Sequence, residues 1–297
     1  MELQRLGSSE EDLSEVVAFM ARLNREASHH VFYCDEDETA LRQSLSEFAI
    51  PPEQTFVVAR ENGVIKGVLG FDADTRLGRA WAYGPFVEHA EHGQVAEFLW
   101  RLSVPLLPQE VVQLELAFDV RNKGLERFAE SHGMTLYTDM LVLALRNDDW
   151  APLTLGKHQV GDLAPQHFEA FEKVHETSFP ATFWTAQEII DRLDERRRVL
   201  VAENGGEVIG YVYAEVDTPT RQGGIEFLAV DPERRRTGVG TALVEESLRW
   251  LFSVPDVDEV FVIVDDVNPA GRLLFEGFGF RVIRRMMAFR TPRPSTP

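Results

Sequence analysis

The pattern of apolar and polar positions occurs twice along the chain. Residues 56–71, FVVARENGVIKGVLGF, and residues 199–216, VLVAENGGEVIGYVYAEV, each alternate like two strands joined at an Asn-Gly pair. An Asn-Gly pair favours a tight hairpin turn because both residues accept positive φ angles. A second stretch repeats too, since NKGLERFAESHGM (122–134) parallels NPAGRLLFEGFGF (268–280). Self-similarity over this distance predicts two copies of one domain.

The order of the predicted elements is also shared by the two halves. Each half begins with helical segments, continues with the hairpin and a further strand, and ends with a helix, a strand, a short helix and a final strand. This order predicts an α/β fold in which a central mixed sheet is flanked by helices. We expect the domains at 1–150 and 151–297, joined near 146–158, and a disordered tail at 291–297.

Composition restricts the class of protein and its compartment. The 297 residues are 44% hydrophobic, which suits two domains with full cores. No apolar run reaches the length of a membrane span, and the acidic N-terminus does not resemble a signal peptide. The single cysteine, Cys34, excludes an intrachain disulfide and fits a reducing compartment. We therefore expect a cytoplasmic protein that is a monomer or a homodimer.

The net charge of −19 disfavours some partners. A surface this acidic repels nucleic acid and anionic membranes, so neither is expected as a partner. The same field attracts cations such as amines, although acidity also serves solubility.

Positive charge nevertheless gathers in DPERRRTGVGTALVEESL, residues 231–248. The strand 225–230 ends before Pro232, and apolar residues after Gly238 and Gly240 recur at helical spacing. A helix start offers unpaired N–H groups and the positive end of a dipole, so Arg235 and Arg236 beside it predict a phosphate site. A solvated basic turn with ordinary capping glycines is the alternative.

The same turn resembles a known family. Val230, Pro232, Arg235, Gly238 and Gly240, placed between a strand and a helix, are similar to the acyl-CoA loop of the GNAT superfamily of N-acyltransferases. NPAGRLLFEGFGF resembles the Asn-x-x-Ala-x-x-Leu-Tyr-x-x-x-Gly-Phe segment of that family. The resemblance covers the second half and extends more weakly to the first. The two-copy arrangement is similar to that of mycothiol synthase, by architecture alone.

The resemblance implies an acetyl-CoA site in the second half and no metal. The strand before the loop would splay from its neighbour, so that its backbone pairs with the pantetheine arm. Asn268 would lie beside that arm, and Arg272 could reach a phosphate. The implied contacts are Leu228, Ala229 and Val230 for pantetheine, and Arg235, Arg236, Thr237, Gly238, Val239, Gly240 and Thr241 for pyrophosphate.

The family's chemistry also requires a base and an acid. Glu226 is the candidate base, because it lies on the same strand as the pantetheine contacts and strand alternation puts it on the face of Leu228 and Val230. It could equally be a surface carboxylate. The tyrosine that serves as acid in many relatives aligns with Phe275, which has no proton to give. Tyr211 and Tyr213 are possible substitutes, or else core aromatics.

The first half departs from this pattern. Gly93 aligns with Gly238 and Val95 with Gly240, but Glu88 and Glu91 replace the arginines and would repel phosphate. We expect a degenerate copy that does not bind acyl-CoA productively. His89 and His92 with Glu91 provide too few placed ligands to predict a metal site.

The sequence therefore favours an acetyl-CoA-dependent N-acetyltransferase that acts on a small amine or a peptide N-terminus, with the second domain catalytic. The alternative is a non-catalytic CoA-binding sensor or pseudoenzyme, which Phe275 favours. A transferase that uses aminoacyl-tRNA is a third possibility, which the acidic charge opposes.

Overall fold

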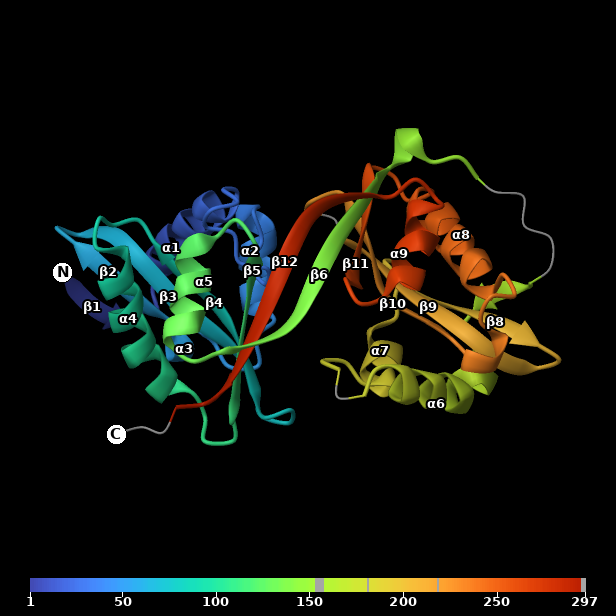
Figure 1. Cartoon of the computed structure of the whole chain (residues 1–297), viewed down its shortest axis with the longest axis horizontal. Coiled ribbons are helices and arrows are strands. Elements are labelled where there is room, and N and C mark those ends of the chain that lie inside the picture. Colours follow the sequence, from blue (N-terminus) through green and yellow to red (C-terminus); the bar gives the residue numbers. More distant parts are fainter. Residues whose placement is uncertain (153–157, 181, 218, 295–297) are drawn as a thin grey trace. The chain divides into compact units, whose positions relative to one another are not determined.

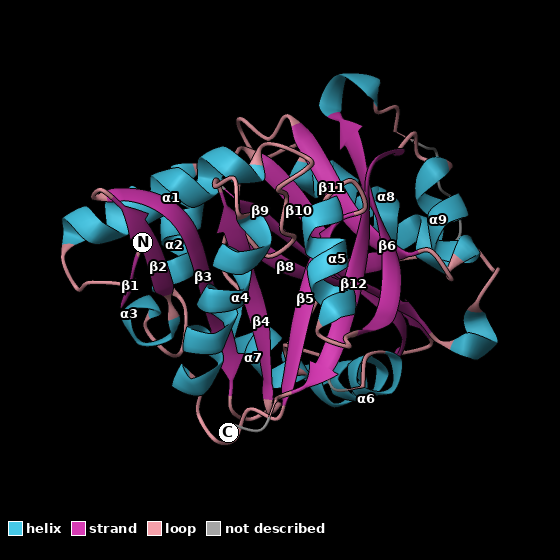
Figure 2. Cartoon of the chain, turned by 60° about the vertical axis from the view of Figure 1, so that its left-hand side comes forward, coloured by secondary structure: helices cyan, strands magenta, loops and turns pink. Residues whose placement is uncertain are grey.

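Two runs of strands and helices follow one another along the chain (Figure 1). The computed structural model describes residues 1–152, 158–180, 182–217 and 219–294. They form two compact units, Met1–Met140 with Arg285–Pro297, and Leu141–Arg284. Both units combine strands with covering helices, so the α/β fold with mixed sheets is confirmed (Figure 2). No helix within the described ranges has the length and apolar character needed to cross a membrane.

The first unit contains a sheet in the order β1-β2-β3-β4-β5-β12. Its β4–β5 pair is parallel, and its other registered pairs are antiparallel. Its helices are α1 (Glu10–Asn24), α2 (Glu38–Ser46), α3 (Pro52–Thr55), α4 (His92–Ser103) and α5 (Lys123–Ser131). Its strands are β1 (Glu2–Arg5), β2 (Val57–Glu61), β3 (Val64–Asp74), β4 (Arg79–Val87) and β5 (Gln113–Asp119), with the start of β6 (Thr135–Arg146) and most of β12 (Arg281–Pro292).

The second unit contains a sheet in the order β6-β11-β10-β9-β8-β7, in which β10 and β11 are parallel. Helices α8 and α9 cover one face, and α6 and α7 cover the other, so a separate apolar cluster fills each side. Its helices are α6 (Phe168–Ser178), α7 (Ala186–Arg192), α8 (Val239–Leu251) and α9 (Pro269–Glu276). Its strands, besides the end of β6 and the start of β12, are β7 (Val160–Asp162), β8 (Arg197–Asn204), β9 (Glu207–Asp217), β10 (Gln222–Val230) and β11 (Glu259–Asp265).

The two halves exchange their last strands. In the first unit, residues Met286–Pro292 of β12 pair antiparallel with β5. In the second unit, β6 lies beside β11. The compact units thus differ from the expected domains 1–150 and 151–297, because the final strand of each half completes the other unit's sheet. The expected disorder at 291–297 is wrong for Thr291 and Pro292, which belong to β12, while 295–297 lie outside the described residues.

Arg293 anchors the end of the exchanged strand. Its guanidinium donates to the carbonyl oxygens of Val104, Leu107, Pro108 and Val111, and its own N–H donates to Val112. Five carbonyls of one connection between α4 and β5 are therefore satisfied by a single residue.

We expect Arg293→Ala to lower the free energy of unfolding by about 2–4 kcal/mol, because it removes several charge-assisted hydrogen bonds at once. Urea denaturation of the full chain measures this change. Arg281→Ala, at an exposed position of the same strand, is the matched control and should stay within about 0.5 kcal/mol of the parent chain. Equal stability of the two variants would contradict the anchoring role.

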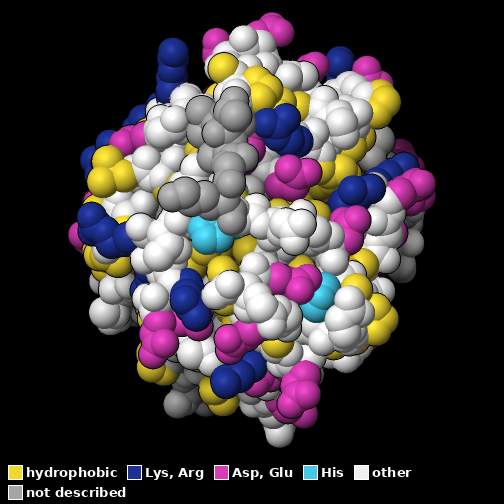
Figure 3. Space-filling model, turned by 90° about the vertical axis from the view of Figure 1, so that its right-hand side faces the viewer, with side chains coloured by type: hydrophobic (Ala, Val, Ile, Leu, Met, Phe, Trp, Pro, Cys, Tyr) yellow, Lys and Arg dark blue, Asp and Glu magenta, His cyan; other side chains and the backbone are white. Residues whose placement is uncertain are grey.

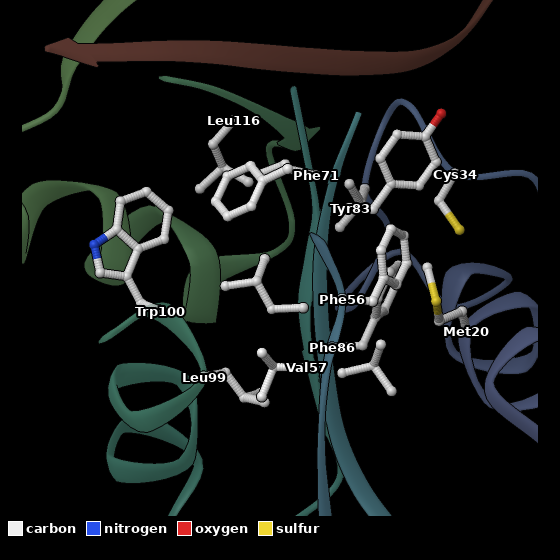
Figure 4. Close-up of a cluster of buried hydrophobic side chains, with 14 of the residues drawn as sticks. Met20, Cys34, Phe56, Val57, Phe71, Tyr83, Phe86, Leu99, Trp100 and Leu116 are labelled. Atoms are coloured by element: carbon white, nitrogen blue, oxygen red, sulfur yellow. The ribbon is translucent and has the colours of Figure 1, made fainter. Parts of the chain in front are cut away.

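The first unit's core has side chains on both faces of its sheet (Figure 4). Leu99 and Trp100 of α4 lie on one side of the strands, and Phe56, Tyr83 and Met20 lie on the other. All five are buried. The alternation of apolar side chains to both faces is why these strands read as continuous hydrophobic runs.

Corresponding residues of the two halves have the same structural roles. A Cβ at Gly67 would lie 3.0 Å from Val95 and Leu99 of α4. A Cβ at Gly210 would lie 3.2 Å from both Val239 and Leu243 of α8. The glycine of each hairpin thus gives a helix room to approach the sheet.

The cap of the short helix is also repeated. Asn122 accepts from the N–H of Leu125 at the start of α5, and Asn268 accepts from Gly271 at the start of α9. After each helix, Gly133 and Gly279 have positive φ. The sequence repeat therefore corresponds to a structural one.

Candidate active site

Strands β10 and β11 separate partway along their length. Their parallel pairing runs only from Gln222–Glu259 to Ile225–Val262. Beyond it, β10 continues to Val230 in contact with β9, and β11 continues to Asp265. The segment Leu228, Ala229 and Val230, expected from the sequence to contact pantetheine, lies along this separated part of β10. The structure thus provides an open strand edge where a ligand's amide groups could pair.

A β-bulge at the start of the separation changes the face on which Glu226 lies. The register of β10 against β9 shifts between Ile225 and Phe227. Phe227 and Ala229 join the cluster under α6 and α7, whereas Leu228 and Val230 pack toward α8. The Glu226 carboxylate lies beside Gly224 and the side chain of Glu215. The sequence prediction that Glu226 shares a face with Leu228 and Val230 is therefore wrong, because a bulge adds one residue to the alternation.

Glu226 is an exposed residue, but many protein atoms surround its carboxyl group. Burial is the main cause that raises the pKa of this carboxyl to about 8, and the negative charge of Glu215 raises it further. Arg192 acts in the opposite direction. A carboxyl that gains its charge near this pH is suited to accept a proton from an ammonium group.

The loop that follows β10 leads into a helix with bare N–H groups. Gly238 precedes α8 with φ +97°, and Arg236 also has a positive φ. Within the described ranges, no protein group accepts from the backbone N–H groups of 236–241. His158 contacts the Thr237 carbonyl oxygen through Nε2 at 2.9 Å. The loop has the features of an anion site.

The remaining predicted contacts lie around this loop. The Arg235 side chain is exposed, and its Nε donates to the Val230 carbonyl oxygen at 3.2 Å. A Cβ at Gly240 would contact Leu274 in the second turn of α9 and Val230, so the start of α8 packs beside α9. Asn268 begins α9 as its cap.

Arg272 is engaged within its own helix. Its Nε donates to Glu276 at 2.7 Å, one turn further on, and this carboxylate raises the pKa of the guanidinium. A phosphate contact by Arg272 would have to compete with Glu276. On the face that Figure 3 shows, cationic and anionic side chains are interspersed rather than gathered by sign.

The candidate acids differ in their surroundings. Phe275 is 3% exposed and packs edge-on against Phe280, so it is a core residue. Tyr211 Oη lies 2.5 Å from His175 Nδ1, and Tyr213 Oη donates to Glu215 at 2.9 Å. Burial raises the pKa of both phenols, which makes them weak proton donors.

Aromatic side chains of the α6–α7 connection pack on Phe227, the residue after Glu226. Phe227 packs with Phe179 and Phe183, whose rings are 4.9 and 5.5 Å away, and Phe183 is 42% exposed. The guanidinium of Arg192 lies over the ring of Trp184, with Cζ 4.1 Å from the ring centroid. The sequence analysis identified neither Arg192 nor Glu215. Only the fold brings these two beside Glu226, so no local signal could identify them.

In the first unit the corresponding opening is occupied by the chain itself. The β4–β5 pairing ends at Trp81–Glu115. Beyond it, the Phe32 N–H donates to Ala117, and the Asp119 N–H donates to His30. The segment 30–32 thus covers the edge of β5. Among the described residues, no segment covers the corresponding edge of β11 in this way.

The first unit's loop also differs from the sequence alignment. Val95 packs on Gly67 as Val239 packs on Gly210, so Val95 corresponds to Val239 and not to Gly240. Gly93 lies inside α4 without a positive φ and does not correspond to Gly238. The alignment is wrong by one residue, because helix packing and not the glycine fixes the register. Glu88 binds Arg22 through two hydrogen bonds of 2.9 Å. His89, Glu91 and His92 are not part of any metal-ligating group of three among the described residues.

Known proteins match this chain in its second half and in its overall fold. Residues 162–280 match the acetyltransferase (GNAT) family. An N-alpha-acetyltransferase of Sulfurisphaera tokodaii is 30% identical over 94 residues, which are 28% of this chain and 56% of that protein. A mycothiol acetyltransferase of Thermobispora bispora is 31% identical over 106 residues, 33% of this chain and 36% of that protein.

A solved structure matches the whole chain. A tandem GNAT protein from the clavulanic acid biosynthesis pathway superimposes with a TM-score of 0.72, covering 100% of this chain and 99% of that one, at 16% identity. This likeness shows that the chain has the tandem fold. The chain spans about half the length of the first curated relative and about a third of the second.

Proposed function

Since residues 162–280 match the acetyltransferase (GNAT) family, we propose that this chain is an acetyl-CoA-dependent N-acetyltransferase whose second unit is catalytic. The acceptor is a small amine or a peptide N-terminus. The observation that carries the proposal is the separation of β10 from β11 directly before a glycine-led helix start whose N–H groups have no acceptor among the described residues. An acyl-CoA would need both features, one for its amides and one for its pyrophosphate.

The residues present fit such a ligand. The separated edge of Leu228–Val230 would pair with the pantetheine amides, and the N–H groups of Arg236–Thr241 would hold the pyrophosphate. Arg235 adds positive charge beside them, and Asn268 caps the start of α9, the helix that packs beside the start of α8. Bound acetyl-CoA supplies the thioester, whose C–S bond is replaced by a C–N bond to the acceptor.

Glu226 takes the proton that must leave before the amine can attack. It lies at the bulge where the two strands part, beside Phe227, on which the aromatic side chains of the α6–α7 connection pack. That placement supports an acceptor site under α6 and α7. A second proton ends on the CoA sulfur, and no side chain within the described ranges is an evident donor for it. Thiol departure then relies on water or on the low basicity of a thiolate.

The competing function is a CoA-binding sensor, which the buried Phe275 favours. Release of free thiol from acetyl-CoA over a panel of primary amines and short peptides distinguishes the two. We expect amine-dependent release that Glu226→Gln suppresses. Acetyl-CoA binding with no release over the whole panel would favour the sensor.

One acetyl-CoA should bind per chain. The segment 30–32 covers the opening of the first unit, and no arginine stands among residues 85–91 before α4, where the second unit has Arg234–Arg236 before α8. Isothermal titration calorimetry of the full chain should therefore give a stoichiometry of one. Two equivalent sites, or a single site that survives a change at Gly238, would contradict this assignment.

A further inference from the structure

Gly224 leaves an open space on the backbone beneath the candidate base. A Cβ at this position would lie 2.5 Å from Glu226 Oε1 and 4.0 Å from Glu215 Cγ. Gly224 is also the residue opposite Glu215 across β9 and β10. Both glutamate side chains therefore border the same space, and only the absence of a side chain at Gly224 allows Glu226 to fold back into it.

The two carboxylates are held differently. Glu215 accepts from Tyr213 Oη at 2.9 Å, and Arg197 of β8 lies 3.7 Å from its Oε2. Arg197 also pairs with Asp194. In the described part of the chain, by contrast, no hydrogen bond or ion pair reaches the carboxylate of Glu226. The carboxylate of Glu215 is thus held in place, and the carboxylate of Glu226 is able to move.

The other charged or titratable groups near this space are Arg192 of α7 and His175 of α6. Arg192 stacks on Trp184 and acts on Glu226 through its charge. His175 is buried with both ring nitrogens engaged, by Tyr211 Oη and by the Trp184 carbonyl oxygen, and burial lowers its pKa. Burial therefore favours the neutral form of His175.

We propose that Glu215 is the positioning residue of the base: its carboxylate, held by Tyr213 and facing Glu226 across the space that Gly224 leaves open, opposes a second negative charge there and so favours proton uptake by Glu226. The inference rests on the proposed function for the source of the transferred proton. In that step an N–H bond of the acceptor's ammonium breaks and an O–H bond forms on Glu226. Glu215 remains charged beside the amine, so the pair favours cationic primary amines over neutral or anionic acceptors.

The pair can be observed without any substrate. In the full chain labelled with ¹³C at the glutamate carboxyl carbons, the resonance that Glu226→Gln removes identifies Glu226. We expect this resonance to titrate well above the range of an ordinary glutamate. Glu215→Gln keeps an acceptor for Tyr213 but removes the charge, so the titration midpoint of Glu226 should fall by about one unit or more.

Gly224→Ala is the second variant. The added methyl group displaces only the end of a flexible side chain, so the fold is kept while the pair is broken. The titration midpoint of Glu226 should fall in Gly224→Ala as well. Glu207→Gln, at an exposed position of the same strand as Glu215, is the matched control and should leave it unchanged.

An ordinary midpoint for Glu226 in the parent chain would overturn the proposal, and so would a midpoint that Glu215→Gln does not move. The proposed function is tested separately by thiol release. If Glu226 titrates as expected but the chain acetylates no amine, the Glu215–Glu226 proposal stands and the acetyltransferase proposal fails. If the chain acetylates an amine but Glu226 titrates as an ordinary glutamate, the acetyltransferase proposal stands and the Glu215–Glu226 proposal fails.

Discussion

Gly238→Asp should abolish acetyl-CoA binding by the full chain. Gly238 precedes α8 in the left-handed conformation, and the backbone N–H groups around it have no protein acceptor within the described ranges. An aspartate brings a carboxylate to the point where an anionic pyrophosphate must approach, and its Cβ blocks close contact. Affinity should fall by about two orders of magnitude or more, because a charge-assisted contact is exchanged for repulsion. Calorimetry of parent and variant measures the loss.

Two controls separate charge from backbone strain. Gly238→Asn has the same shape and the same φ requirement without the charge, so it should lose less affinity than the aspartate. Gly206→Asp places an aspartate at φ +86° in the hairpin of the same unit, with open space around it. It should bind acetyl-CoA as the parent chain does. Unchanged affinity in a folded Gly238→Asp chain would show that this loop does not bind the phosphates.

Glu226→Gln should lower turnover by about 10²–10⁴-fold, the range that general-base help commonly provides. The amide keeps the shape of the side chain and removes its basicity. Affinity for acetyl-CoA should change less than about twofold, because Glu226 lies on the acceptor face and not at the loop. Steady-state kinetics with an amine found by thiol release, together with calorimetry, measures both quantities.

The pH dependence gives a separate test of the same residue. Burial and Glu215 raise the pKa of Glu226 to about 8, so the carboxyl is mostly protonated at neutral pH and becomes a base as the pH rises. The rate of the parent chain should therefore increase with pH through about 8 and then level off. Glu226→Gln should lose this limb, whereas the control Glu207→Gln should retain it. Full activity with an unchanged profile in Glu226→Gln would remove Glu226 from the mechanism.

Local features of the second half could be predicted from sequence because nearby residues decide them. Pro232 ends the strand and Gly238 supplies the left-handed turn. Asn268 caps α9 by accepting from the N–H of Gly271, three residues further along. Each role depends on backbone preferences and contacts within one turn. The repeat itself followed from the same local signals, since Asn122 and Asn268 cap equivalent helices.

The face of Glu226 depended on the pairing of two strands. Alternation alone assigns it to the side of Leu228, and only the register of β10 against β9 reveals the extra residue between Ile225 and Phe227. Glu215 and Arg192 could not be associated with Glu226 for a related reason. Residues on different elements meet only after the sheet and its covering helices have assembled.

The sequence by itself determined the glycine turn before α8, the repeated α/β order and the candidate base, because periodicity, glycine and proline positions act over a few residues. Tertiary structure alone decided three other features: the exchange of β6 and β12, the covering of β5 by residues 30–32, and the proximity of Glu215 to Glu226 above Gly224. These depend on which strand edges meet. Edge pairing is set by the free energy of the whole sheet and not by any one segment.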